Sequence, residues 1–346
     1  MRIAWTGLWL FACGQRAADA DVRAAAVPEP GTAEPVSAAP ETAAPADVVH
    51  HDSPPPEPTS TSTGSPNDGR LEGGVALPEA GPGFLHNPRR TNAEARWGTV
   101  EMVGGIVRAA ETVERELPGS MLVVNDVGLP GGGPIPHHGS HRSGRDVDIL
   151  FYLTDPDGNP IPSVGVPLDP RGRGWDFKDL TERADDVRVR IDLPRTWRFL
   201  QALAEDEAAG LQRVFVAEHL RTLLLEHAAR VRAPRTAIER VGDAACQPEM
   251  PHDDHLHVRF FCTAQDVRAG CQDSYPIYTW RRRALTAEGV EAVQATRTRR
   301  DRPASKTVSR AQARAKAGRM HWLVKQTLDA RETWSAQPHP GRRWCP

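Results

Sequence analysis

The sequence predicts an α+β domain in which helices flank a small, largely antiparallel sheet that holds the candidate site. Three observations support this fold class. Two stretches, residues 146–153 and 255–261, are rich in the β-branched and aromatic side chains of strands. Two stretches with helical spacing, residues 193–210 and 218–231, lie between them along the chain. Histidines gather beside both strand-like stretches, so the sheet is expected to carry the functional residues.

The elements follow in chain order. Residues 95–117 have apolar side chains at helical spacing, despite Gly104 and Gly105, and residues 121–127 are typical of a strand. The helix expected from residue 193 begins with a proline, which suits the first turn.

A short strand over residues 214–216 is predicted to precede the helix at 218–231. His219 and His227 lie on that helix and are interpreted as structural or solvent-facing.

The first histidine-dense window covers residues 138–148. It is a loop rich in glycine and serine that leads into the strand-like stretch, and it would bring His141 beside Asp148. Asp146 is expected either to orient a ligand imidazole or to cap the turn.

The second window ends in His255-Leu256-His257, which runs into a predicted strand. Alternate residues of a strand point to the same face, so His255 and His257 converge on one point. Catalytic zinc sites use three nitrogen or oxygen ligands and leave one position to water. His141, Asp148 and His257 would supply that set for Zn²⁺.

The acids and the arginine near the second window have alternative interpretations. Asp253 and Asp254 are expected to be solvated or to accept hydrogen bonds behind the ligands, and they are left out of the ligand set. Arg259 would either meet a substrate carboxylate or pair with a nearby acid.

The constellation resembles the penicillin-insensitive murein endopeptidases, which are related to D-Ala-D-Ala metallopeptidases, lysostaphin-type peptidases and hedgehog domains. The shared pattern is a histidine, six intervening residues, an aspartate and a later His-x-His, matched by His141, Asp148 and His255–His257. The endopeptidase branch has two further histidines, each three residues ahead, and His138 and His252 stand there. The resemblance covers about residues 90–275.

The resemblance implies roles for these residues. His141, Asp148 and His257 would bind zinc, His255 would take the proton of the attacking water, and His138 and His252 would line the cleft. The implied function is hydrolysis of peptide cross-links in peptidoglycan, at the D-alanyl to meso-diaminopimelate bond. The alternatives are a zinc D,D-carboxypeptidase that trims stem peptides and a non-catalytic, zinc-containing wall-binding module.

Other hydrolase and nucleotide signatures are absent from the sequence. It has no His-Glu-x-x-His helix, Gly-x-Ser-x-Gly elbow or Ser-x-x-Lys motif, so no serine is offered for acylation by β-lactams. The formal net charge of −2 does not favour a nucleic-acid partner.

The N-terminal part is expected to be an export signal followed by a linker. Residues 1–20 contain a short apolar run and Leu10-Phe11-Ala12-Cys13, which is similar to a bacterial lipoprotein cleavage box. Residues 21–82 are dominated by small and polar residues and by proline, and are predicted to be a disordered linker. The alternative to the lipoprotein signal is ordinary signal cleavage after Ala18-Asp19-Ala20. Either signal is expected to export the protein to the periplasm, with Cys13 as a candidate lipid anchor to the outer membrane in the first case.

The remainder is divided into a zinc peptidase domain, residues 83–283, and a basic helical extension, residues 284–346. Trp322, Trp334 and Trp344 are expected to pack this extension against the domain.

Export implies an oxidising compartment in which disulfides persist. Cys262 and Cys271 are predicted to pair because of their hairpin-like spacing, and Cys246 would then pair with Cys345 by elimination.

Overall fold

A computed structural model describes residues 59–88, 94–248, 252–296, 310–334 and 345. The expected signal, Cys13, and residues 21–58 of the expected linker lie outside these residues. The described part confirms an α+β fold. Within it, no helix is both long and apolar enough to cross a membrane.

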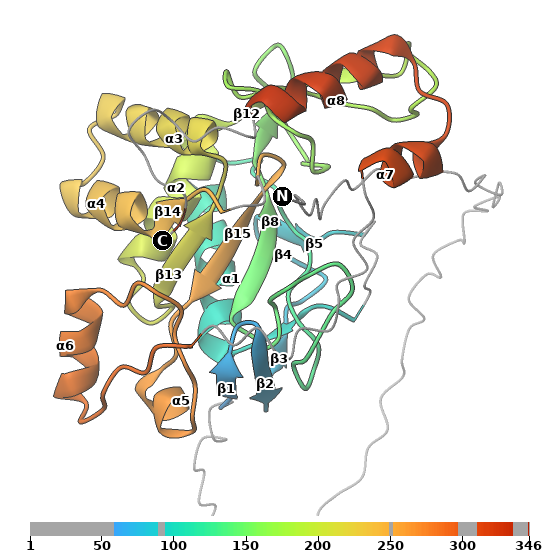
Figure 1. Cartoon of the computed structure of the whole chain (residues 1–346). Helices are drawn as coiled ribbons and strands as arrows, with labels where there is room; N and C mark the ends of the chain where they lie inside the picture. The colour runs from blue at the N-terminus through green and yellow to red at the C-terminus, as the bar shows by residue number, and fades with distance from the viewer. Residues whose placement is uncertain (1–58, 89–93, 249–251, 297–309, 335–344, 346) are drawn as a thin grey trace, which may run out of the picture. The chain divides into compact units, whose positions relative to one another are not determined.

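The described residues form one seven-stranded sheet (Figure 1). Two of its strand pairs, β14–β13 and β7–β5, are parallel, and the other pairs are antiparallel. In spatial order the strands are β14 (Ala245–Cys246), β13 (Leu211–Phe215), β15 (His255–Phe260), β8 (Asp146–Leu150), β7 (Leu122–Val124), β5 (Phe84–His86) and β4 (Ala80–Gly81).

Three smaller antiparallel sheets accompany it in the described part of the chain. One has the order β10 (Pro160–Ile161), β9 (Leu153–Thr154), β12 (Val187–Ile191) and β11 (Arg173–Asp176). The other two are the pairs β1 (Thr61–Ser65) with β2 (Asp68–Glu72), and β3 (Val75–Ala76) with β6 (Trp97–Gly98).

The described helices lie in the order α1 (Val100–Glu116), α2 (Leu193–Glu205), α3 (Glu218–Arg230), α4 (Arg235–Ala244), α5 (Ala264–Arg268), α6 (Thr279–Ala287), α7 (Arg310–Ala317) and α8 (Trp322–Trp334). The first of them starts later than the expected residue 95, because the Thr99 side chain accepts a hydrogen bond from the backbone N–H of Met102 and caps the helix there. Asp192 caps α2 in the same way, and Pro194 occupies its first turn.

A glycine inside α1 has a packing reason. A Cβ at Gly105 would lie 2.5 Å from the Cβ of Ala209, a distance that real Cβ atoms essentially never show. The glycine therefore permits α1 to approach the turn between α2 and β13 closely, which offsets its unfavourable helix propensity.

The register of β8 with β15 separates a core face from a functional face. Val147, Ile149, Leu256 and Val258 lie on one face and are buried in the main hydrophobic core together with residues of α1 and α2. Because side chains alternate along a strand, the intervening residues lie on the opposite face: Asp146 pairs with Arg259, and Asp148 pairs with His257.

The predicted linker is wrong in its C-terminal part, because β1 to β4 lie within residues 59–82. This segment is held by polar contacts rather than by a long apolar run. Buried Ser62 donates from its backbone N–H to Asp266 and from its hydroxyl to the Ser143 carbonyl, at 2.7 and 2.8 Å. Arg145 donates to the same hydroxyl at 3.0 Å.

The boundary expected at residue 283 falls inside α6, where Leu285 is fully buried. In the extension, α8 packs on the rest of the protein through Leu323, Val324 and Leu328, which are buried. Trp322, by contrast, is 64% exposed. Trp344 lies outside the described residues.

Both predicted disulfides are confirmed, Cys262–Cys271 and Cys246–Cys345. The second joins the end of the chain to β14, which pairs with β13.

Candidate metal centre

His141 lies in the loop before β8 and has a left-handed backbone conformation with φ 66°. Its Nδ1 donates a hydrogen bond to the Val127 carbonyl at 2.7 Å, which fixes the ring and the tautomer. The opposite nitrogen, Nε2, is buried and has no hydrogen-bond partner. A buried imidazole nitrogen of this kind is suited to metal coordination.

Asp148 and His257 face one another because of the strand register, and Figure 1 shows their strands, β8 and β15, side by side. Asp148 Oδ1 lies 3.1 Å from His257 Nδ1 and 3.4 Å from His141 Nε2. This oxygen is buried and makes no regular hydrogen bond. His141 and His257 thus each place one ring nitrogen near the same oxygen, Oδ1 of Asp148.

Asp146 orients the imidazole of His257. Its Oδ1 accepts hydrogen bonds from His257 Nε2 at 2.8 Å and from Arg259 Nε at 2.6 Å. Its Oδ2 also accepts from the His141 backbone N–H at 3.4 Å. Both roles considered for Asp146 are therefore present, and Arg259 pairs with an acid.

His138 lies close to the same point. Its Nε2 donates to Asp126 Oδ2 at 3.0 Å, and its Nδ1 is 3.4 Å from Asp148 Oδ2. His138, His141 and Asp148 can place one ligand atom each within 4.8 Å of one another.

The donor set fits a metal ion. Zn²⁺ prefers imidazole nitrogen and carboxylate oxygen at about 2.0–2.2 Å. His141 Nε2 and Asp148 Oδ1 are both buried without hydrogen-bond partners, and buried polar atoms of this kind require an explanation. A cation between them would satisfy both, and Nδ1 of His257 is the adjacent third donor.

His255 and His252 complete the histidine cluster. His255 Nδ1 donates to Asp254 Oδ1 at 2.6 Å, while its Nε2 lies 3.6 Å from Asp148 Oδ1. The ring centre of His252 lies 4.8 Å from that of His255 and 5.7 Å from that of His257. All six histidine and aspartate residues predicted for the site therefore lie in one region.

The carboxylates set the electrostatics of this region. Burial lowers the pKa of His255, but Asp148 and Asp254 outweigh it and raise the pKa to about 9. Burial raises the pKa of Asp148, but the neighbouring imidazoles of His141 and His255 hold it well below its usual range. For Asp146 the burial effect is outweighed by Arg259 and His257, so its pKa is also lowered.

The sequence analysis missed two residues near the cluster. Asp126, which accepts from His138, lies in the segment before the first window and could have been found there. Arg331 of α8 contacts Asp253 and Asp254, and the expected packing of the extension gave no indication of that contact.

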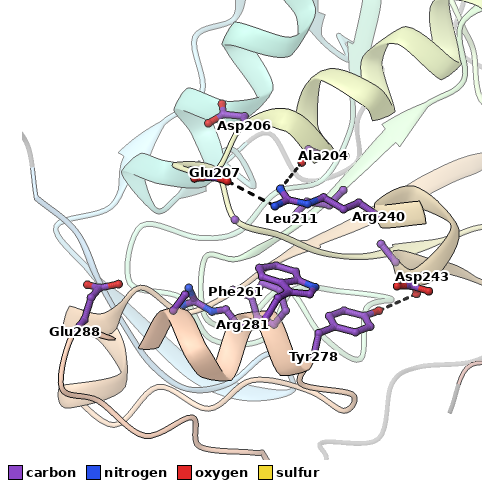
Figure 2. Close-up of a pocket in the computed structure, with 14 residues that line it drawn as sticks. Ala204, Asp206, Glu207, Leu211, Arg240, Asp243, Phe261, Tyr278, Arg281 and Glu288 are labelled. Atoms are coloured by element: carbon purple, nitrogen blue, oxygen red, sulfur yellow. Dashed lines mark hydrogen bonds and ion pairs between the residues drawn. The ribbon is translucent and has the colours of Figure 1, made fainter. Parts of the chain in front are cut away.

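A pocket of about 410 Å³ lies elsewhere, between the end of α2, α4 and α6. Figure 2 shows Tyr278 donating to the Asp243 carbonyl, at 2.7 Å, and Arg240 donating to the Ala204 carbonyl, at 2.9 Å. None of the six predicted site residues lines this pocket, so it is separate from the candidate metal centre.

Fold and site together define an α+β protein with a histidine and carboxylate centre on one face of its main sheet. The family model described as penicillin-insensitive murein endopeptidase matches residues 62–316. The chain belongs to this family, and the match is longer at both ends than the span of about 90–275 expected from the motifs.

Individual relatives carry the same name. Penicillin-insensitive murein endopeptidases of Klebsiella pneumoniae subsp. pneumoniae and Pectobacterium atrosepticum are each 27% identical to this chain over 228 residues. These matches cover 63% of this chain and 72% and 71% of the relatives. One from Escherichia coli is 25% identical over 224 residues, covering 62% of this chain and 70% of the relative.

Proposed function

We propose that the protein is a zinc-dependent murein endopeptidase that hydrolyses peptide cross-links of peptidoglycan, at the D-alanyl to meso-diaminopimelate bond. The family supports the reaction class. The observation that carries the proposal is the convergence of unpartnered His141 Nε2 and Asp148 Oδ1 next to His257 Nδ1.

His141, Asp148 and His257 would hold the zinc. When bound, zinc lowers the pKa of a coordinated water to about 7 and polarises a carbonyl as a Lewis acid. Asp146 keeps His257 in the tautomer whose Nδ1 is free to bind, because it accepts the hydrogen bond from Nε2.

His255 would transfer the proton. Its Nδ1–H is fixed by Asp254, so Nε2 is the atom that can take a proton from the attacking water. The carbonyl carbon gains the water oxygen, the peptide C–N bond breaks, and the same nitrogen returns the proton to the leaving amine. Coordination of Asp148 would reduce the negative charge that raises the pKa of His255, which brings the imidazole toward the range of a general base.

His138 and His252 would line the cleft and stabilise the charge that develops on the scissile carbonyl oxygen. Because Nε2 of His138 donates to Asp126, Nδ1 can donate to that oxygen only when both ring nitrogens carry a proton. The proposed role of His252 rests on its ring lying near those of both His255 and His257.

The proposed location is the periplasm, with lipidation at Cys13 as the attachment to the outer membrane. The two disulfides support an oxidising compartment.

The test is digestion of cross-linked peptidoglycan by purified protein, with zinc or with a chelator, followed by chromatography of muropeptides. We expect conversion of dimers to monomers that requires zinc and is lost in His255→Ala. His227→Gln, on α3 and away from the cluster, is the matched control and should retain activity.

Other outcomes have clear meanings. Release of terminal D-alanine without conversion of dimers would identify a D,D-carboxypeptidase. Binding to the wall without any product would identify a non-catalytic module.

A further inference from the structure

We propose that α8, at the C-terminal end of the described chain, is part of the active centre, because Arg331 positions His255 through Asp254. This inference rests on the proposed role of His255 in proton transfer. The family match ends at residue 316, before α8 begins at Trp322, so the contact is not a property of the matched region.

Arg331 is a buried cation that binds two adjacent acids. Its Nε donates to both carboxylate oxygens of Asp253, at 3.1 and 3.0 Å, and its Nη2 donates to Oδ1 of Asp253 at 2.5 Å. The same Nη2 donates to Asp254 Oδ2 at 3.1 Å. A planar guanidinium can make such forked contacts, whereas an ammonium group is a point charge.

The contact continues to the catalytic histidine. Asp254 uses Oδ2 for Arg331 and Oδ1 for His255 Nδ1, which is 2.6 Å away. One carboxylate therefore joins a residue of α8 to the proposed proton-transfer group. Its orientation is fixed from both sides.

The adjacent carboxylates of Asp253 and Asp254 need a nearby positive charge. Asp253 and Asp254 are buried, and adjacent carboxylates in a low-dielectric environment disfavour each other's ionisation. Burial raises the pKa of Asp254, but the positive charge of Arg331 and the neighbouring His255 outweigh it and hold this pKa below its usual range. Without Arg331, Oδ2 of Asp254 would lose its hydrogen-bond donor, and the carboxylate that accepts from His255 through Oδ1 would be fixed from one side only.

Further contacts fix the position of Arg331. Trp334 donates from its indole nitrogen to Asp253 Oδ2 at 3.1 Å. Just before the helix, the His321 backbone N–H donates to the Leu180 carbonyl at 2.9 Å. The contacts of His321 and Trp334 therefore hold the two ends of the helix, which suits a fixed element better than a mobile arm.

The test compares Arg331→Gln and Arg331→Lys with Arg314→Gln in the full-length, zinc-loaded protein. Arg314 is the matched control because it also contacts acids of α8, Asp329 and Glu332, but touches neither Asp253 nor Asp254. The measurements are kcat and KM on a purified muropeptide dimer, the zinc dissociation constant by chelator competition, and the low-field proton resonance of His255 Nδ1–H.

We expect Arg331→Gln to lower kcat by roughly 10–100-fold, the usual effect of removing an outer partner of a metal site. KM and the zinc dissociation constant should change by less than about threefold, because Arg331 touches no proposed ligand. The His255 Nδ1–H resonance should shift or broaden. Arg331→Lys should recover part of kcat, and Arg314→Gln should match the wild type in every measurement.

Asp254→Asn keeps the inference testable if Arg331→Gln does not fold. It should lower kcat similarly, and the double variant, where it folds, should lose little more than either single variant, because both act on one contact. Wild-type kcat with an unchanged resonance in Arg331→Gln would overturn the inference, as would parallel loss of zinc and activity. A wild-type protein that cleaves no dimer would refute the proposed function, whereas the resonance would still report whether Arg331 positions His255.

Discussion

Asp146→Asn tests whether the outer hydrogen bonds of the site tune its metal affinity. The wild-type carboxylate accepts from His257 Nε2 at 2.8 Å and from Arg259 Nε at 2.6 Å. Asparagine keeps the shape and one oxygen but removes the charge that makes His257 a stronger ligand. Loss of such a partner weakens metal binding by roughly 10–100-fold, which corresponds to about 1.4–2.8 kcal/mol.

The same substitution should destabilise the metal-free protein. Arg259 is buried, and a buried charge left without its partner costs about 3–5 kcal/mol. Because asparagine can still accept one hydrogen bond, we expect a loss at the lower end of this range. Urea unfolding of the metal-free protein measures this loss in the free energy of unfolding separately from the change in zinc affinity.

The assay for affinity is competition between the protein and a chromogenic chelator at fixed pH. Asp157→Asn, at an exposed loop position, is the control and should leave both affinity and stability unchanged. A folded Asp146→Asn protein whose zinc dissociation constant stays within about threefold of the wild type would refute the proposed role of Asp146.

Three further results are expected. His141→Ala should remove stoichiometric zinc binding, measured by elemental analysis after gel filtration, and retention of one tightly bound zinc would contradict the ligand assignment. Replacement of both Cys262 and Cys271 by serine opens a crosslink with a sequence separation of 9, so urea unfolding should show a free energy lower by about 2–3 kcal/mol; an unchanged value would exclude this contribution. Arg145→Gln should reduce the free energy of unfolding by about 3–5 kcal/mol because it leaves buried Asp273 unpaired, and a calorimetric midpoint equal to that of the wild type would be inconsistent with this view.

The central residues of the site could be predicted because the alternation of side chains along a strand determines which of them share a face. His255 and His257 are two positions apart on a strand and therefore share a face, and Asp148, which pairs with His257, lies on the same face of the neighbouring strand. The role of Asp146 remained open in the sequence because turn capping and imidazole orientation require the same residue type. The structure contains both contacts.

The first hairpin, β1–β2, could not be predicted from composition. Residues 59–72 have few large apolar side chains, so the usual signal of a buried strand is weak. Ser62 is nevertheless fully buried because Ser143, Arg145 and Asp266 satisfy its hydrogen bonds. Partners this distant in the chain are visible only after folding.

The contact of Arg331 with Asp253 and Asp254 could not be predicted either, because its partners are also distant in the sequence. The arginines of the extension are numerous, and charged residues on helices usually face solvent. Burial of this one depends on Asp253 and Asp254 being adjacent in a loop far away in sequence.

The most direct test of the proposed metal centre is a crystal structure of the zinc-loaded protein with anomalous diffraction measured at the zinc edge. The account predicts one strong peak within about 2.0–2.2 Å of His141 Nε2, a carboxylate oxygen of Asp148 and His257 Nδ1. A peak bound by His138, His141 and Asp148 but distant from His257, or a peak outside the cluster, would contradict it.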